Sequence, residues 1–119
     1  MDVYFDHYTG FESEPEVIFR SADGKQKANL WHGYFSYIMK NAVPNEAGYW
    51  ENLALIYHTC TGWYASSPFE LSQVNEAICQ LQICYSNLWE NDTLQAYNNL
   101  VSVFEYASKN KFSIFVEYS

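Results

Sequence analysis

The most unusual feature of this 119-residue chain is a long stretch that lacks positive charge. Between Lys40 and Lys109 there is no lysine or arginine, yet seven carboxylates fall in the same stretch. They are Glu46, Glu51, Glu70, Glu76, Glu90, Asp92 and Glu105. Soluble domains usually intersperse both signs, so we expect this stretch to present a negative potential with little internal neutralisation. Such a surface favours encounter with a cationic partner.

The overall shortage of cations excludes two classes of partner. The chain has 6 lysine and arginine residues against 14 aspartate and glutamate residues, a formal net charge of −8 and a pI near 4.6. Phosphate binding needs clustered lysine and arginine, so we expect no nucleic-acid surface. The same balance argues against binding to an anionic membrane.

Long hydrophobic runs are also lacking. The apolar runs are short and interrupted, which predicts no transmembrane span. The N-terminus carries Asp2 and Asp6 where a secretory signal peptide would have a basic region and then an apolar one. We therefore expect a cytoplasmic protein. Apolar residues make up 49% of the chain, which predicts a single folded domain over residues 1–119.

Residues suited to metal binding or catalysis are few and badly spaced. The cysteines are Cys60, Cys79 and Cys84. An odd number without metal spacing predicts reduced, buried thiols. The histidines His7, His32 and His58 contain no His-x-x-x-His pair, and we expect no metal and no cofactor. There is also no glycine-rich phosphate loop and no Gly-x-Ser-x-Gly motif. The sequence therefore predicts no catalytic residues and favours binding over enzymatic activity.

Hydrophobic periodicity predicts an α+β domain with strand-like ends. Alternation over residues 2–8 indicates a half-buried strand, and residues 16–20 indicate a second one that ends at the turn signal Asp23-Gly24. Residues 112–118 are rich in strand formers and predict a terminal strand. We expect this strand to pair with the N-terminal one, since an isolated strand leaves its backbone groups unsatisfied.

Between these ends the pattern predicts four helices. Residues 26–41 and 45–61 have apolar residues at helical spacing, with Gly62 placed for a C-terminal cap. A capping box at residues 67–70 predicts the start of a third helix with an apolar stripe from Leu71 to Leu88. Asp92 is placed to cap a fourth helix that continues to about residue 108. The predicted fold is a compact four-helix domain with a small antiparallel sheet formed by the terminal segments.

Apolar side chains on the polar faces of these predicted helices are the best indication of a binding surface. Leu55 falls between Glu51 and His58 on the second helix, and Tyr106 falls among polar residues on the fourth. Interfaces favour aromatic anchors, and surrounding charge adds association rate and selectivity. The alternative is that these helices are buried on two sides. The predicted partner-binding residues are Glu51, Leu55, His58, Phe69, Glu70, Glu76, Ile83, Glu90, Asp92 and Tyr106.

A small, acidic chain with eleven tyrosines and four tryptophans resembles the immunity proteins of bacterial toxin systems, those of contact-dependent growth inhibition above all. The resemblance concerns size and composition over the whole chain, without a shared motif. It implies a cytoplasmic antidote that binds and neutralises a cognate toxin domain, commonly a basic nuclease.

Two other functions fit the same composition. One is an acidic adaptor or nucleic-acid mimic that occupies the basic groove of a host protein. The other is a small-ligand-binding domain or enzyme with an aromatic pocket. The residues for such a pocket would be Trp31, Trp50, Trp63 and Tyr64.

Overall fold

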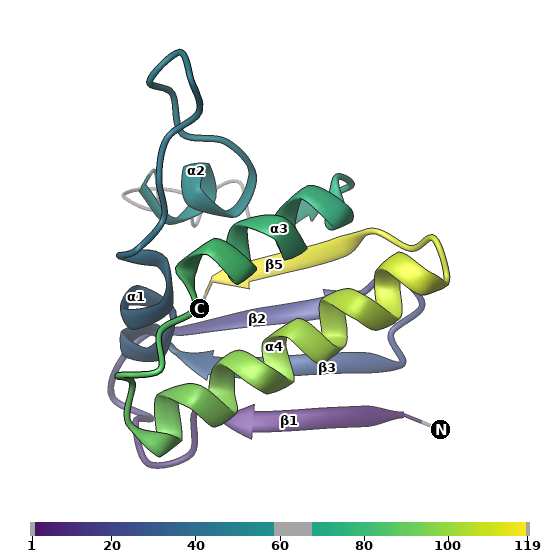
Figure 1. Ribbon diagram of the computed structural model, residues 1–119. Helices are drawn as coiled ribbons and strands as arrows, with labels where there is room; N and C mark the ends of the chain where they lie inside the picture. Colours follow the sequence, from purple (N-terminus) through teal and green to yellow (C-terminus); the bar gives the residue numbers. More distant parts are fainter. Residues whose placement is uncertain (1, 59–67, 119) are drawn as a thin grey trace.

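The computed structural model describes residues 2–58 and 68–118, which form one mixed sheet and four helices (Figure 1). The strands are β1 (Val3–His7), β2 (Glu16–Ser21), β3 (Gln26–Trp31), β4 (Phe69–Leu71) and β5 (Ile114–Tyr118). The helices are α1 (His32–Met39), α2 (Asn52–His58), α3 (Val74–Cys84) and α4 (Asn91–Lys109). The α+β class with four helices, predicted from periodicity, is thereby confirmed for the described residues.

The sheet is larger than the predicted pairing of the two termini, and it is connected differently. Its strand order is β1-β3-β2-β5-β4, in which β1 runs parallel to β3 and the other neighbours are antiparallel. The terminal strand β5 pairs with β2 and β4, so the predicted pairing with the N-terminal strand is wrong. The second and third strands of the order, β3 and β2, form a hairpin that separates β1 from β5.

Residues 26–31 form strand β3, whereas periodicity predicted the start of a helix there. The turn at Asp23-Gly24 folds this segment back against β2, in the register Phe19 to Ala28. Ala28 and Leu30 then point into the core and are fully buried. Pairing with β1 on one side and with β2 on the other satisfies backbone groups of this strand, and this outweighs a helix preference of at most ~0.7 kcal/mol per ordinary residue.

The second and third helices are shorter than predicted. Phe69 begins strand β4, and α3 begins only at Val74, with no side-chain cap at Gln73. The helix ends at Cys84, so Leu88 is not part of its buried stripe and is 89% exposed. Helix α2 begins at Asn52 rather than at residue 45. The predicted continuation to residue 61, the cap at Gly62 and the first residue of the capping box lie outside the described residues.

The predicted fourth helix is confirmed almost to its ends. Helix α4 covers Asn91–Lys109, and Tyr97, Leu100 and Phe104 are buried as predicted. Glu90 occupies the N-cap position without a side-chain hydrogen bond. Asp92 therefore lies in the first helical turn, where its charge stabilises the positive end of the helix dipole rather than capping it.

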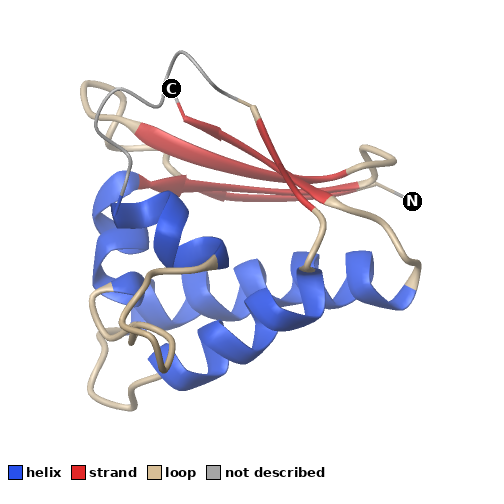
Figure 2. Ribbon diagram, turned by 90° about the horizontal axis from the view of Figure 1, so that it is seen from above, coloured by secondary structure: helices blue, strands red, loops and turns tan. Residues whose placement is uncertain are grey.

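The helices pack on one face of the sheet and make a two-layer domain (Figure 2). Strand residues that point toward the helices are fully buried, among them Phe19, Ile114 and Val116. Their neighbours Arg20 and Phe115 point to the other face, which no described helix covers. Among the described residues, no helix combines the length and apolarity needed to cross a membrane.

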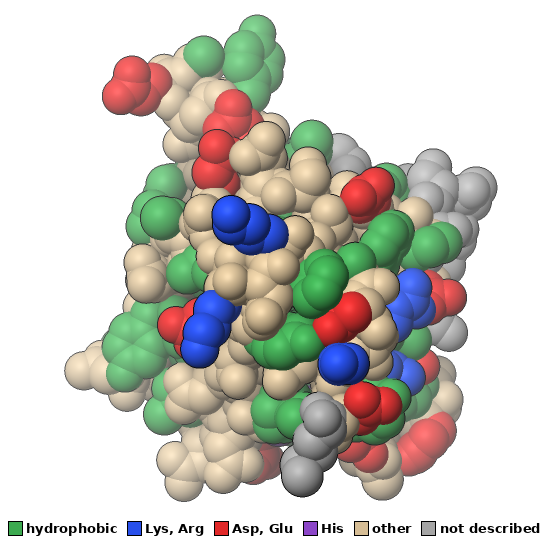
Figure 3. All heavy atoms as spheres, turned by 90° about the vertical axis from the view of Figure 1, so that its right-hand side faces the viewer, with side chains coloured by type: hydrophobic (Ala, Val, Ile, Leu, Met, Phe, Trp, Pro, Cys, Tyr) green, Lys and Arg blue, Asp and Glu red, His purple; other side chains and the backbone are tan. Residues whose placement is uncertain are grey.

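Positive charge gathers at one end of the domain. Five of the six lysine and arginine residues belong to the β2–β3 hairpin or lie at the C-terminal end of α4 and just after it. They are Arg20, Lys25, Lys27, Lys109 and Lys111. The two segments meet where the backbone N–H of Ala22 donates to the carbonyl of Ser113 at 3.0 Å. Figure 3 views the molecule from this side, where the lysine and arginine side chains appear together. The remaining helical layer is left without cations except Lys40.

The surroundings of His7 at the end of β1 favour its neutral form. Its Nε2 atom lies 2.8 Å from Nδ2 of Asn99 on α4, and an amide nitrogen can only donate, so the imidazole accepts. Burial lowers the pKa of His7 below its ordinary value, while Asp6 and Asp92 act in the opposite direction. The folded protein therefore binds a proton at His7 less readily than the unfolded chain does.

We expect this histidine to make stability fall with acidification. As the pH falls from about 7.5 to about 5.5, the unfolded chain takes up the His7 proton first, near its ordinary pKa of 6.5, so the free energy of unfolding decreases. Urea unfolding at both pH values should show a smaller decrease for His7→Gln, which keeps an acceptor for Asn99 but does not titrate. Equal pH dependence in the two proteins would contradict this assignment.

Candidate functional site

A hollow in the helical layer brings together five of the ten residues predicted to bind a partner. It has a volume of about 420 Å³ and lies between the start of α2, strand β4 and the first turn of α3. We call it the acidic groove. Its described lining residues are Trp50, Glu51, Asn52, Leu55, Ile56, Phe69, Glu70, Leu71, Ser72, Gln73 and Glu76. The predicted residues among them are Glu51, Leu55, Phe69, Glu70 and Glu76.

Asn52 fixes the start of α2 at one wall of the groove. Its backbone has a positive φ of 57°, a left-handed conformation that asparagine tolerates better than most residues. The side-chain Nδ2 donates to the carbonyl of Gln73 at 2.9 Å, and Oδ1 accepts from the backbone N–H of Leu53 at 2.9 Å. One amide therefore joins the beginning of α2 to the link between β4 and α3.

Gln80 on α3 holds the start of α2 in place with two further hydrogen bonds. Its Nε2 donates to the carbonyl of Glu51 at 2.7 Å, and its Oε1 accepts from the N–H of Ala54 at 3.4 Å. The second bond satisfies the N–H of Ala54, which has no intrahelical partner at the start of the helix, while the carbonyl of Glu51 also accepts from the N–H of Leu55 at 3.2 Å. The groove is thus built on two packed helices and an edge strand, which holds its side chains in a preformed arrangement.

The apolar part of the groove is accessible to a partner. Leu55 is 45% exposed although it belongs to a helix whose neighbours Leu53 and Ala54 are fully buried. Trp50 is half-buried and stacks on His58, with ring centroids 3.9 Å apart. Such a rigid aromatic beside an exposed leucine offers contact area whose burial costs little conformational entropy.

The charged part of the groove is negative only. Glu51, Glu70 and Glu76 are exposed, and none of the described lining residues is a lysine or arginine. Ser113 Oγ donates to Oε2 of Glu70 at 2.9 Å, which orients that carboxylate without neutralising it. Glu70 pairs with Phe115 and its carboxylate is bonded to Ser113, so it points to the outer face of the sheet. Glu51 and Glu76 make a local negative potential beside the apolar residues, and such a site attracts a cation with apolar neighbours.

The other five predicted residues are not among the described lining residues of the groove. His58 lies next to it through its stacking on Trp50. Ile83 is 60% exposed near Val43, and Tyr106 donates a hydrogen bond of 2.5 Å to Asp23 on the β2–β3 turn. Glu90 and Asp92 line a different pocket, beside α1.

The sequence does not indicate every residue of this site. Trp50 and Gln80 are not among the residues that the sequence predicts to bind a partner. Neither contact has a local signal, because Gln80 binds backbone groups 26 and 29 residues away. Phe69 was placed on a helix but lies on β4, and it reaches the same hollow from the strand.

The two described residues among those predicted for an aromatic pocket do not meet. Trp31 and Trp50 line different hollows, and Trp63 and Tyr64 lie outside the described residues. Of the cysteines, Cys84 is buried, and burial raises the pKa of its thiol to about 11. Cys79 is exposed, which corrects the prediction of a buried thiol there, and Cys60 lies outside the described residues. Both described cysteines belong to α3, but Cys79 lies on the side of the helix that faces solvent, whereas Cys84 lies on the side that faces the core.

In the described ranges, no group of three or more histidine, cysteine, aspartate or glutamate side chains is arranged to hold a metal ion. What the groove offers is therefore apolar contact and negative charge. Comparison of the chain with protein-family models, with curated proteins and with solved structures finds no match.

Proposed function

We propose that this chain is a non-enzymatic binding protein whose acidic groove receives a basic segment of a partner protein. One observation carries the proposal: five predicted partner-binding residues, which are either charged or apolar on a predicted polar face and lie far apart in the sequence, line a single hollow. Opposite charge on a partner would speed encounter, and contact with Leu55 and Trp50 would slow release.

For the partner, we propose a cognate bacterial toxin domain, which this chain neutralises as an immunity protein in the cytoplasm. The support is the resemblance in size and composition, together with a groove that selects positive charge. A basic nuclease domain fits this groove because its phosphate-binding surface must be rich in lysine and arginine.

The test begins with the neighbouring gene. We expect the gene upstream to encode a large secreted protein with a variable C-terminal domain. Bacteria that produce this C-terminal domain alone should stop growing, and co-production of the chain should restore growth and yield a stable complex on gel filtration. Continued growth arrest together with the absence of a complex would remove the toxin proposal.

Leu55→Ala is expected to raise the dissociation rate of that complex by about tenfold and to leave the association rate almost unchanged, because a desolvated apolar contact is lost only as the complex separates. Surface plasmon resonance measures both rates. Ile83→Ala is the matched control, since Ile83 is exposed but lies outside the groove. If the two variants release the partner equally fast, the groove is not the contact surface.

A further inference from the structure

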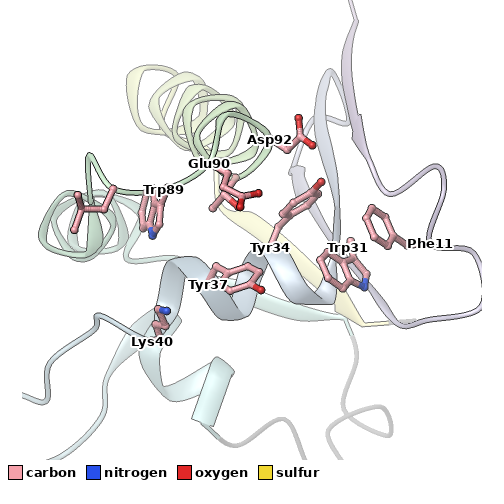
Figure 4. Close-up of a pocket in the computed structure, with 10 residues that line it drawn as sticks. Phe11, Trp31, Tyr34, Tyr37, Lys40, Trp89, Glu90 and Asp92 are labelled. Carbon is pink, nitrogen blue, oxygen red and sulfur yellow. The ribbon is translucent and has the colours of Figure 1, made fainter.

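A second pocket, of about 400 Å³, lies between α1, the end of β3 and the segment that leads into α4 (Figure 4). None of its described lining residues belongs to the acidic groove. Aromatic rings make its walls, and the two carboxylates Glu90 and Asp92 lie at its exposed rim. Pockets of this volume are large enough for a small organic ligand.

The wall formed by Trp31 and Tyr34 is rigid. Phe11 stacks on Trp31 with ring centroids 4.1 Å apart, and Tyr34 meets Trp31 edge-on at 5.2 Å. The indole also covers Gly33 so closely that an added Cβ would lie 2.3 Å from the ring. A side chain at this position would displace the indole, so glycine is required for this wall.

The opposite wall is Trp89, which the core holds in place. Its ring lies 5.2 Å from that of Tyr97, and the hydroxyl of Tyr97 donates to the carbonyl of Leu81 at 2.9 Å in the buried interior. Tyr37 lies between the two walls and is 47% exposed. The aromatic rings around the pocket are therefore preorganised rather than assembled when a ligand arrives.

The charge around this pocket favours a cation. Glu90 and Asp92 add a negative potential that reaches the wall, since burial and then these two carboxylates raise the pKa of Tyr34. The pocket already attracts an ammonium group of the chain itself. Lys40 Nζ lies 5.4 Å from the centroid of the Tyr37 ring, which is the geometry of a cation–π contact.

We propose that this pocket binds a small organic cation with a quaternary ammonium head. Aromatic faces attract such a head, and its methyl groups gain dispersion contacts with the rings. A quaternary head has no N–H groups to satisfy, so a wall of rings with carboxylates only at the rim suits it better than it suits a primary amine. The ligand head would take the position over Tyr37 that the Lys40 ammonium now occupies.

Calorimetric titration of the full chain with choline tests the proposal, and 3,3-dimethylbutan-1-ol serves as the uncharged isostere. We expect saturable binding of choline and at least about tenfold weaker binding of the isostere, because only the cation is attracted by the ring faces and the rim. Acetylated trimethyl-lysine amide carries the same head, and its affinity relative to choline separates a free ligand from a modified side chain. Equal binding of choline and the isostere, or binding of neither cation, would overturn the proposal.

Two variants, with substitutions only at exposed residues, sharpen the test and leave the core unchanged. Lys40→Gln removes the competing ammonium and should tighten choline binding by about two- to tenfold. The double change Glu90→Gln and Asp92→Asn should weaken it by a similar factor. Tyr49→Leu, at an exposed aromatic residue that lines neither pocket, is the control and should leave choline binding unchanged. A loss of binding in Lys40→Gln would mean that the lysine itself holds the ligand and would contradict a cationic head.

Discussion

Replacement of Glu51, Glu70 and Glu76 together by lysine is expected to slow association with the basic partner domain by about tenfold or more at low salt. All three side chains are exposed, so the variant should keep its fold. Long-range attraction acts before contact and therefore affects the association rate. Salt screens it over about 8 Å at physiological ionic strength, so the difference should shrink as salt is added.

The control for this experiment carries the same change in net charge at other exposed glutamates, namely Glu12, Glu14 and Glu105. Stopped-flow mixing over a series of salt concentrations measures both variants beside the unsubstituted protein. If the control variant slows association as much as the groove variant does, then the total charge matters and the groove does not. Association that is indifferent to salt and to both variants would assign the acidic balance to solubility alone.

Phe19→Ala is expected to lower the free energy of unfolding by about 3–5 kcal/mol, and Phe115→Ala by about 1 kcal/mol. The two residues belong to neighbouring strands but point to opposite faces of the sheet. Phe19 is fully buried and contacts the rings of Phe35 and Phe104, at 5.3 and 5.9 Å between centroids. Its removal leaves a cavity between sheet and helices. Phe115 pairs mainly with Arg20, whose guanidinium lies 5.7 Å from its ring centroid.

Urea unfolding followed by circular dichroism measures both losses. A stability of 5–15 kcal/mol is typical of domains, so Phe19→Ala should remain folded only at low urea. The ratio of the two losses is the informative quantity, because it reports whether the core lies on one face of the sheet. Equal losses would mean that the outer face is also covered and that the two-layer description is wrong.

The sequence predicted those elements whose signal is local and strong. Helix α4 was found because its apolar positions repeat at helical spacing over 19 residues. Strand β1 was found because apolar and polar residues alternate over residues 2–8, and strand β2 because residues 16–20 end at the turn signal Asp23-Gly24. The negative character of the helical layer also followed from the sequence, since no fold can place a lysine where the chain has none.

The sequence did not predict elements whose identity depends on a distant partner. Residues 26–31 and 69–71 are strands because β2 and β5 lie beside them, and short segments of mixed pattern have no decisive preference of their own. The order of the strands in the sheet was not predicted either. Strands pair through backbone N–H and C=O groups, and these are the same in every residue except proline, so they do not identify the partner strand.

The candidate site divides in the same way. Charge marked Glu51, Glu70 and Glu76 in the sequence and helical phase marked Leu55, because both are local properties. Phe69 was marked by a helical phase that its segment, strand β4, does not have. Their convergence on one groove was decided by tertiary structure, through the amides of Asn52 and Gln80 that fasten α2 against the β4–α3 segment. The second pocket also depends on tertiary structure, since rings from α1, β3 and the segment before α4 meet only when the helices pack on the sheet. Local patterns specify which chemistry a chain carries, whereas long-range packing determines which of those groups share a surface.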